Sequence, residues 1–185
     1  IGTYIYNLLS ELCRIEHDFK FILIGAPDRL RTLVGQHEKF EIRESHTPIY
    51  SISEQIKLPG VAGDADLLHC PHHNVPVMWR GKLVVTFHDA LHWDHPELMP
   101  NWRGKIYLRL VSCRIARADR IIVPSKFTAE RLCENIGALR DKVNIIPQGV
   151  DRHRFSRRSS AGVRAVLNRY GIHAGNYLLY VGNMK

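Results

Sequence analysis

The apolar positions of the chain follow two spacings that alternate along it, and each spacing predicts one kind of element. Steps of one, three and four between apolar residues, as from Tyr4 to Leu12, are typical of amphipathic helices. Short apolar runs rich in Val and Ile predict buried strands. The predicted strands cover 19–24, 40–43, 65–70, 82–88, 121–124 and 143–147, and the predicted helices cover 4–12, 28–34, 53–58, 102–116 and 127–136. This alternation predicts an α/β fold with a doubly wound parallel sheet.

Cap and turn residues indicate how these elements are connected. Asp28 and Ser125 are expected to cap the helices that follow them. We expect mainly loops at 45–63, which contains several Pro and Gly residues, and at 90–101, which is rich in aromatic and polar residues. After residue 148 the apolar periodicity fades and indicates a linker. A helix at 163–169 and a strand at 177–181 then predict the start of a second unit.

The apolar run at 83–87 leads directly into His88 and Asp89. Ligands bind at the carboxyl ends of the strands in open parallel sheets. A histidine at that position can exchange a proton with a sugar hydroxyl or a phosphate near neutral pH. We therefore predict that His88 and Asp89 are catalytic. The sequence leaves open the alternative that His88 is bonded to a neighbouring loop.

A glycine stands at the beginning of the first predicted helix. Gly2 has no side chain, so the backbone N–H groups there can approach a phosphate, which the helix N-terminus also favours by its charge. An ordinary helix start would look the same in the sequence.

Six histidines crowd into residues 69–95, namely His69, His72, His73, His88, His92 and His95. Grouped histidines are typical of zinc sites. However, neither H-E-x-x-H nor C-x-x-C occurs in the sequence. We therefore expect no metal, and we expect most of these side chains to line a polar cleft.

The charge of the chain is unevenly distributed. The net charge is +8, but seven basic residues and no acidic one lie between 152 and 185, so the rest of the chain is nearly balanced. Nucleic-acid binding is therefore not expected. The basic helix at 102–116 is either a solvated face or a surface that rests on anionic lipid.

The expected compartment follows from the cysteines and from the apolar runs. The four cysteines share no tight spacing, which favours a reducing, cytoplasmic compartment. No run of 18 apolar residues predicts a membrane-spanning helix. The sequence starts without Met and stops just after an apolar run, and we expect it to be a fragment of a longer protein.

Six segments spread over nearly the whole chain carry a resemblance that none of them carries alone. They are IGTY at 1–4, DLLH at 66–69 with Pro71, VTFHD at 85–89 with Pro96 and Glu97, ADRIIVPS at 118–125, IIPQGVD at 145–151, and YLLYVG at 177–182. In this order they resemble glycosyltransferase family 4, the group 1 glycosyltransferases of the GT-B fold.

The resemblance implies two Rossmann-like domains that face each other across a cleft. Residues 1–148 would be the N-terminal, acceptor-binding domain without its first strand. Residues 149–175 would be the interdomain linker, and 176–185 the first strand of the donor-binding domain. The fragment alone would be inactive, because the donor domain's paired glutamates and phosphate-binding residues would lie beyond residue 185.

The resemblance also implies roles for single residues. His88 matches the active-site histidine that contacts the transferred sugar, Asp89 accompanies it, and Gly2 belongs to the loop that approaches the donor diphosphate. Gln148 departs from the family pattern, in which asparagine is more usual. We further predict that the acceptor is bound by the polar residues His72, His73, Asn74 and Ser125.

The function implied is that of a retaining hexosyltransferase. It would move a sugar from a GDP- or UDP-sugar, mannose-type favoured, to a hydroxyl of a glycan or a lipid-linked acceptor in cell-surface polysaccharide or glycolipid synthesis. It would need no cofactor and no metal, and would work in the cytoplasm, with the inner face of the cytoplasmic membrane as the candidate site. The alternatives are a nucleotide-sugar epimerase of the same fold and a metal-dependent hydrolase built on the histidines.

Overall fold

The computed structural model describes residues 1–35, 37–99, 101–138, 140–152, 154–173, 175 and 177–182. The chain divides into two compact units, Ile1–Gln148 and Gly149–Lys185. In the described part of the chain, no helix is both long enough and apolar enough to cross a membrane. The assignment of these units to an acceptor domain, a linker and a donor domain stays a prediction.

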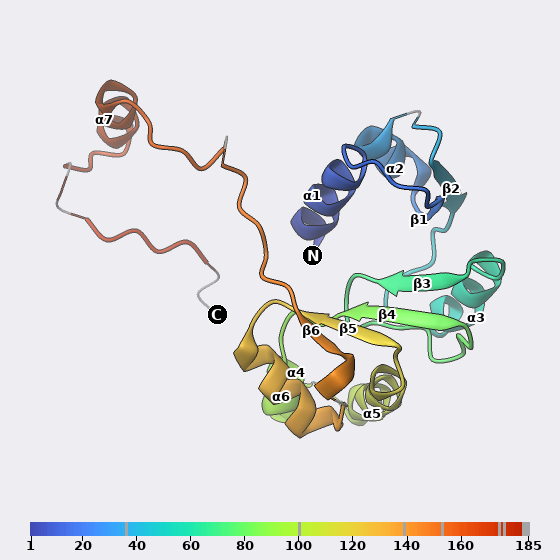
Figure 1. Cartoon of the computed structure of the whole chain (residues 1–185). Coiled ribbons are helices and arrows are strands. Elements are labelled where there is room, and N and C mark those ends of the chain that lie inside the picture. Colours follow the sequence, from blue (N-terminus) through green and yellow to red (C-terminus); the bar gives the residue numbers. More distant parts are fainter. Residues whose placement is uncertain are drawn as a thin grey trace. The chain divides into compact units, whose positions relative to one another are not determined.

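The first unit alternates strands and helices (Figure 1). Its elements are α1 (Gly2–Leu12), β1 (Phe21–Gly25), α2 (Pro27–Val34), β2 (Phe40–Glu44), α3 (Ile52–Val61), β3 (Leu67–Cys70), β4 (Lys82–Thr86), α4 (Leu91–Asp94), η1 (Pro96–Leu98), α5 (Trp102–Ala116), β5 (Arg120–Val123), α6 (Lys126–Ile136), η2 (Arg140–Lys142) and β6 (Val143–Ile145). All pairings are parallel, which confirms the predicted α/β class. The strands form two ladders, β1-β2 and β3-β4-β5-β6.

The core lies on the face of the four-stranded sheet that α5 and α6 cover (Figure 1). Alternate residues of a strand point to the same face, and on this face the side chains of β3, β4 and β5 are buried. They pack with α5 and α6 in one cluster that includes Leu83, Val85, Ile121, Val123, Val111, Ile115 and Leu132. Burial of this apolar surface is the main stabilising contribution to the unit.

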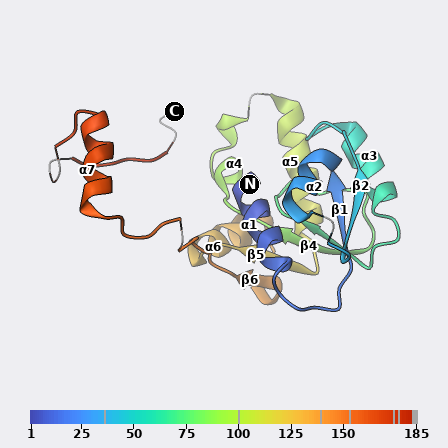
Figure 2. The same cartoon turned by 90° about the horizontal axis from the view of Figure 1, so that it is seen from above.

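The opposite face of the sheet is covered differently. In Figure 2, α1 overlies β4 and β5, and the hydroxyl of Tyr4 lies 3.3 Å from that of Thr86 on β4. Thr86 is buried, whereas Val84 and Ile122, which point to the same side, are half-buried. Helices therefore lie on both faces, as a doubly wound sheet requires.

A reciprocal pair of hydrogen bonds sets the start of β4 against the start of β5. The N–H of Leu83 donates to Oδ2 of Asp119 (2.8 Å), and the N–H of Asp119 donates to the carbonyl of Leu83 (2.9 Å). Asp119 lies between α5 and β5, so these bonds place the end of α5 beside the central strand.

Three local predictions were wrong in detail. Asp28 lies in the first turn of α2 and does not cap it; Ala26 is the N-cap and Pro27, with its preset φ, begins the helix. The helix predicted at 53–58 extends over α3 and contains Pro59. The expected loop at 90–101 contains α4 and η1, which are too short to produce a visible apolar periodicity.

In the second unit, the described residues form one helix, α7 (Ser160–Arg169), whose N-cap Ser159 accepts a hydrogen bond from the N–H of Gly162. The strand predicted at 177–181 was wrong, since these residues form no strand in the structure. A strand requires the hydrogen bonds of a neighbouring strand. Among the described residues, no strand pairs with this segment.

Truncation of a core side chain should show how much the central strand contributes. We expect Leu83→Ala to lower the free energy of unfolding by about 2–5 kcal/mol, because it leaves a cavity between β4 and the helices. Leu98→Ala, at a residue that is 54% exposed, is the matched control and should change it by less than about 0.5 kcal/mol. Urea unfolding of the intact protein measures both; equal losses would contradict the assigned core.

Candidate active site

His88 and Asp89 lie just past the carboxyl end of β4. The strand ends at Thr86, and the N–H of the buried Phe87 still donates to the carbonyl of Ile122 on β5 (2.8 Å). Phe87 therefore holds the chain against the sheet up to the residue before His88. His88 itself is half-buried and Asp89 is exposed.

Both ring nitrogens of His88 are hydrogen-bonded. Nε2 lies 3.0 Å from the carbonyl oxygen of Pro71, and Nδ1 lies 3.2 Å from Nε2 of Gln148. A carbonyl oxygen only accepts, so Nε2 of His88 carries the proton and donates. Nδ1 then accepts from the side-chain amide of Gln148. The two bonds fix one neutral tautomer and one orientation of the ring.

A second group of side chains, Tyr4, Thr86 and His69, links the His88 ring to α1 and to the strands. The ring of Tyr4 meets the ring of His88 edge-on, with 4.9 Å between centroids. The hydroxyl of Thr86 hydrogen-bonds with the hydroxyl of Tyr4 and with Nε2 of His69 (2.9 Å). Burial lowers the pKa of His69, which keeps its ring neutral near pH 7. The buried hydroxyl of Thr86 thus joins helix α1 and strands β3 and β4 next to His88.

Asp89 has a local structural contact. Its Oδ1 accepts a hydrogen bond from the N–H of Leu91 (3.1 Å), at the first residue of α4. Within the described contacts, His88 is oriented by Pro71 and Gln148 and not by Asp89. The catalytic assignment of Asp89 stays a prediction.

Gly2 is the first residue of α1, and Ile1, the N-cap, provides no side-chain hydrogen bond. A Cβ added at Gly2 would meet nothing within 4 Å, so the surrounding protein does not demand glycine there. Tyr4, two residues later, contacts His88. The start of α1 is therefore near the predicted catalytic histidine, and the space beside Gly2 is open.

His72 and His73 continue the site from His88. The ring of His72 lies 6.4 Å from that of His88 and 3.7 Å from that of His73. Burial, together with the neighbouring histidines, lowers the pKa of His73 to about 3. The pKa of His72 is also lowered, first by burial and then by His88. Both rings are therefore neutral near pH 7 and suit uncharged hydrogen-bonding partners.

The two other predicted acceptor residues make structural contacts. Asn74 joins α3 to α5, because its Nδ2 donates to Oε2 of Glu54 (2.9 Å) and its Oδ1 accepts from the hydroxyl of Tyr107. Ser125 caps α6, as its sequence position indicated, and its Oγ accepts from the N–H of Thr128 (3.1 Å). Their part in acceptor binding stays a prediction.

The clustered histidines do not form a metal-binding arrangement in the described part of the chain, where no three His, Cys, Asp or Glu side chains are placed to hold an ion. His73 instead packs its ring against Trp93 and Phe87. Its neighbours are thus largely aromatic.

The sequence did not indicate that Pro71 and Gln148 orient His88. Gln148 follows the end of β6, and Pro71 follows the end of β3, so both lie at the same edge of the sheet as His88. Their positions just after predicted strands could have placed both residues at the same edge as His88. The connection of Tyr4, Thr86 and His69 had no comparable signal, since nothing in the sequence shows which face of the sheet α1 covers.

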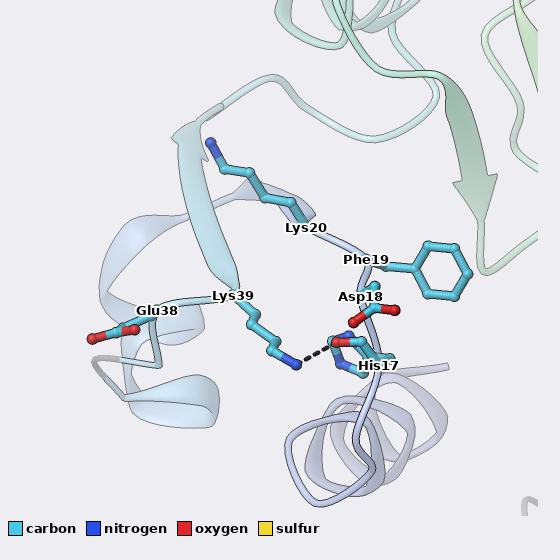
Figure 3. Close-up of a pocket in the computed structure, with 6 residues that line it drawn as sticks. All are labelled: His17, Asp18, Phe19, Lys20, Glu38 and Lys39. Carbon is cyan, nitrogen blue, oxygen red and sulfur yellow. Dashed lines mark hydrogen bonds between the residues drawn. The ribbon is translucent and has the colours of Figure 1, made fainter.

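An open depression of about 390 Å³ lies elsewhere in the unit, lined by His17, Asp18, Phe19, Lys20, Glu38 and Lys39 (Figure 3). Lys39 donates from Nζ to the carbonyl of His17 across it. These residues precede β1 and β2, so the depression lies at the amino ends of those strands. Ligands of open parallel sheets bind at the other edge.

The parallel α/β unit has the Rossmann-like fold of the GT-B glycosyltransferases. The chain belongs to glycosyltransferase family 4, whose family model matches residues 1–154. This confirms the family and the fold class indicated by the sequence. The roles of the predicted site residues stay predictions.

A solved structure supports the same fold. HepE of Anabaena, crystallised in complex with UDP and glucose, is 18% identical to this chain, with a TM-score of 0.57. The match covers 92% of this chain and 47% of that one, so the chain spans about half the length of HepE. A search of curated proteins found no match.

The depressed pKa of His73 predicts a pH-dependent stability. Between pH 6.5 and about 3 the unfolded chain binds more protons than the folded one, so stability is full above pH 6.5 and falls as the pH decreases through this window. We expect urea midpoints to be lower at pH 5 than at pH 7, and His73→Gln to reduce that difference. His173→Gln, at an exposed position, should leave it unchanged. An undiminished difference in His73→Gln would contradict the assignment.

Proposed function

We propose that the protein containing this chain is a retaining hexosyltransferase that uses a nucleotide sugar. The donor is a GDP- or UDP-sugar, with a mannose-type sugar favoured, and the acceptor is a hydroxyl of a glycan or a lipid-linked glycan precursor. The family membership supports sugar transfer, and the UDP and glucose bound to HepE support a nucleotide-sugar donor. The products would serve cell-surface polysaccharide or glycolipid synthesis.

The observation that carries this proposal is the way in which His88 is held. Its protonated Nε2 donates to the Pro71 carbonyl at the carboxyl edge of the sheet, in a half-buried position. A sugar hydroxyl can accept a hydrogen bond as a carbonyl oxygen does. It can therefore replace the Pro71 carbonyl as the acceptor for the Nε2–H of His88. The Gln148 amide keeps the ring in its tautomer while this exchange occurs.

The transfer step requires little more of this unit than positioning. The acceptor oxygen forms a bond to the anomeric carbon while the bond from that carbon to the donor phosphate oxygen breaks, and the departing phosphate takes the acceptor proton on the same face. In this scheme His88 contacts the transferred sugar. The backbone at Gly2 approaches the diphosphate, for which the open space beside it leaves room. His72 and His73 contact the acceptor.

We further propose that the reaction needs no metal or other cofactor and takes place in the cytoplasm, at the inner face of the membrane. Helix α5 supports the membrane contact because it carries the basic residues Arg103, Lys105 and Arg109 and no acidic residue. The contact would be peripheral. No nucleic acid is expected as a partner.

The test is turnover of a panel of nucleotide sugars by the intact protein, with and without candidate acceptors. We expect one donor to be used, and His88→Ala to reduce its turnover by about 100-fold or more while the protein stays folded. His37→Ala, at a histidine beside β2, is the matched control and should keep normal turnover. Normal turnover in His88→Ala would contradict the site assignment.

The same panel distinguishes the alternatives. An epimerase converts the donor without any acceptor, so conversion of that kind would replace the transferase proposal. No turnover of any donor, together with stoichiometric metal in the purified protein, would favour the hydrolase.

A further inference from the structure

A large apolar cavity lies beside the candidate active site within the first unit. Its volume is about 750 Å³, within the range of small-molecule sites. Helix α5 forms one wall, with Ile106 and Leu110, and the start of α3 with Tyr50 and Ile52 forms another. The proposed function uses none of these four side chains.

Two enclosed polar atoms on the wall lack partners. Nε2 of Gln55 and Nδ1 of His92 are buried and have no hydrogen bond within the described structure, and both residues line the cavity. The amide of Gln55 is oriented, because its Oε1 accepts from the N–H of Val77 (2.7 Å). An unpaired buried polar atom costs free energy. These two residues are the polar part of an otherwise apolar wall, which suits a ligand that has a polar group beside an apolar body.

A row of imidazole rings connects this wall with the candidate active site. His73 and His92, both in the cavity wall, lie 6.2 Å apart between ring centroids. From His73 the row continues to His72 at 3.7 Å and then to His88 at 6.4 Å. Since burial keeps His73 neutral near pH 7, this end of the cavity offers hydrogen bonds without charge.

The other side of the cavity reaches the protein surface among exposed apolar residues. Ile52 is 80% exposed, Trp102 67% and Ile106 50%. The guanidinium of Arg103 lies over the Trp102 ring at 5.5 Å, and α5 carries no acidic side chain. This surface is therefore apolar with a basic border, which complements a lipid whose head group is anionic.

From these contacts we infer that the cavity holds the apolar chain, alkyl or isoprenyl, of a lipid-linked acceptor. The inference rests on the proposed transferase function and specifies its acceptor class. The chain passes between α3 and α5 among Ile52, Ile106 and Leu110. The polar group next to it meets Gln55 and His92, and the reacting hydroxyl lies toward His88.

Binding of octyl, decyl and dodecyl maltosides to the intact protein, without donor and below micelle formation, tests this directly. Calorimetry should show affinity rising by about fourfold per added methylene while the chain still fits the cavity. We expect Ile106→Trp, which fills the cavity, to weaken dodecyl maltoside binding by about tenfold or more. Ile15→Trp is the matched control at a residue of similar exposure, 58%, and should bind normally.

Two outcomes would overturn the inference. One is affinity that does not depend on chain length or is unchanged in Ile106→Trp. The other is a dimer that dissociates in Ile106→Trp, because a second copy would then cover this surface. Because no donor is present, failure here would leave donor turnover, and hence the proposed function, standing.

Discussion

The parallel pairing of β3, β4, β5 and β6 is the constraint on which the rest of the first unit depends. Parallel strands present their carboxyl ends at one edge, so residues distant in sequence meet there. Pro71 follows β3, His88 follows β4 and Gln148 follows β6, and the three are joined by the two hydrogen bonds of the His88 ring. The candidate active site is therefore a consequence of strand direction. Helices α5 and α6 stabilise the sheet by packing on its core face.

Thr86 shows how closely the site and the fold are connected. Its hydroxyl is buried on the face opposite the core, where it bonds with Tyr4 on α1 and His69 on β3. Leaving such a group unpaired would cost about 1–3 kcal/mol. The hydrogen bond from Thr86 therefore favours the position of α1 in which Tyr4 contacts His88. In that position the start of α1 also lies near His88. A phosphate at Gly2 and a sugar at His88 can then belong to one donor.

The sequence predicted elements well where periodicity and caps agree. The bounds of α5, Trp102–Ala116, match those predicted, and Ser125 caps α6 as expected. It failed where the deciding contact is distant or the element is short. The Gln148–His88 bond joins residues 60 positions apart, and α4 has four residues. Residues 177–181 have the composition of a strand, but a strand forms only beside a partner, which composition does not reveal.

Asn74 and Ser125 illustrate the same limit within the site. Both are polar residues close to strand ends, and the sequence alone does not distinguish a ligand contact from a bridge or a cap. The structure shows Asn74 joining α3 to α5 and Ser125 capping α6. It also shows an apolar cavity next to the histidines, in a segment where the sequence indicated a polar cleft. The sequence does not show this cavity because its walls come from three helices, α3, α4 and α5, that are separated along the chain.

The most direct test of the central claim is a crystal structure of the intact protein with its nucleotide-sugar donor bound. In that complex we expect Nε2 of His88 within hydrogen-bond distance of the donor sugar, with a sugar hydroxyl in place of the Pro71 carbonyl, while Nδ1 keeps its bond to Gln148. We expect the diphosphate against the backbone at Gly2. A donor bound with its sugar away from the carboxyl edge of β4, and His88 still bonded to Pro71, would contradict this role of His88.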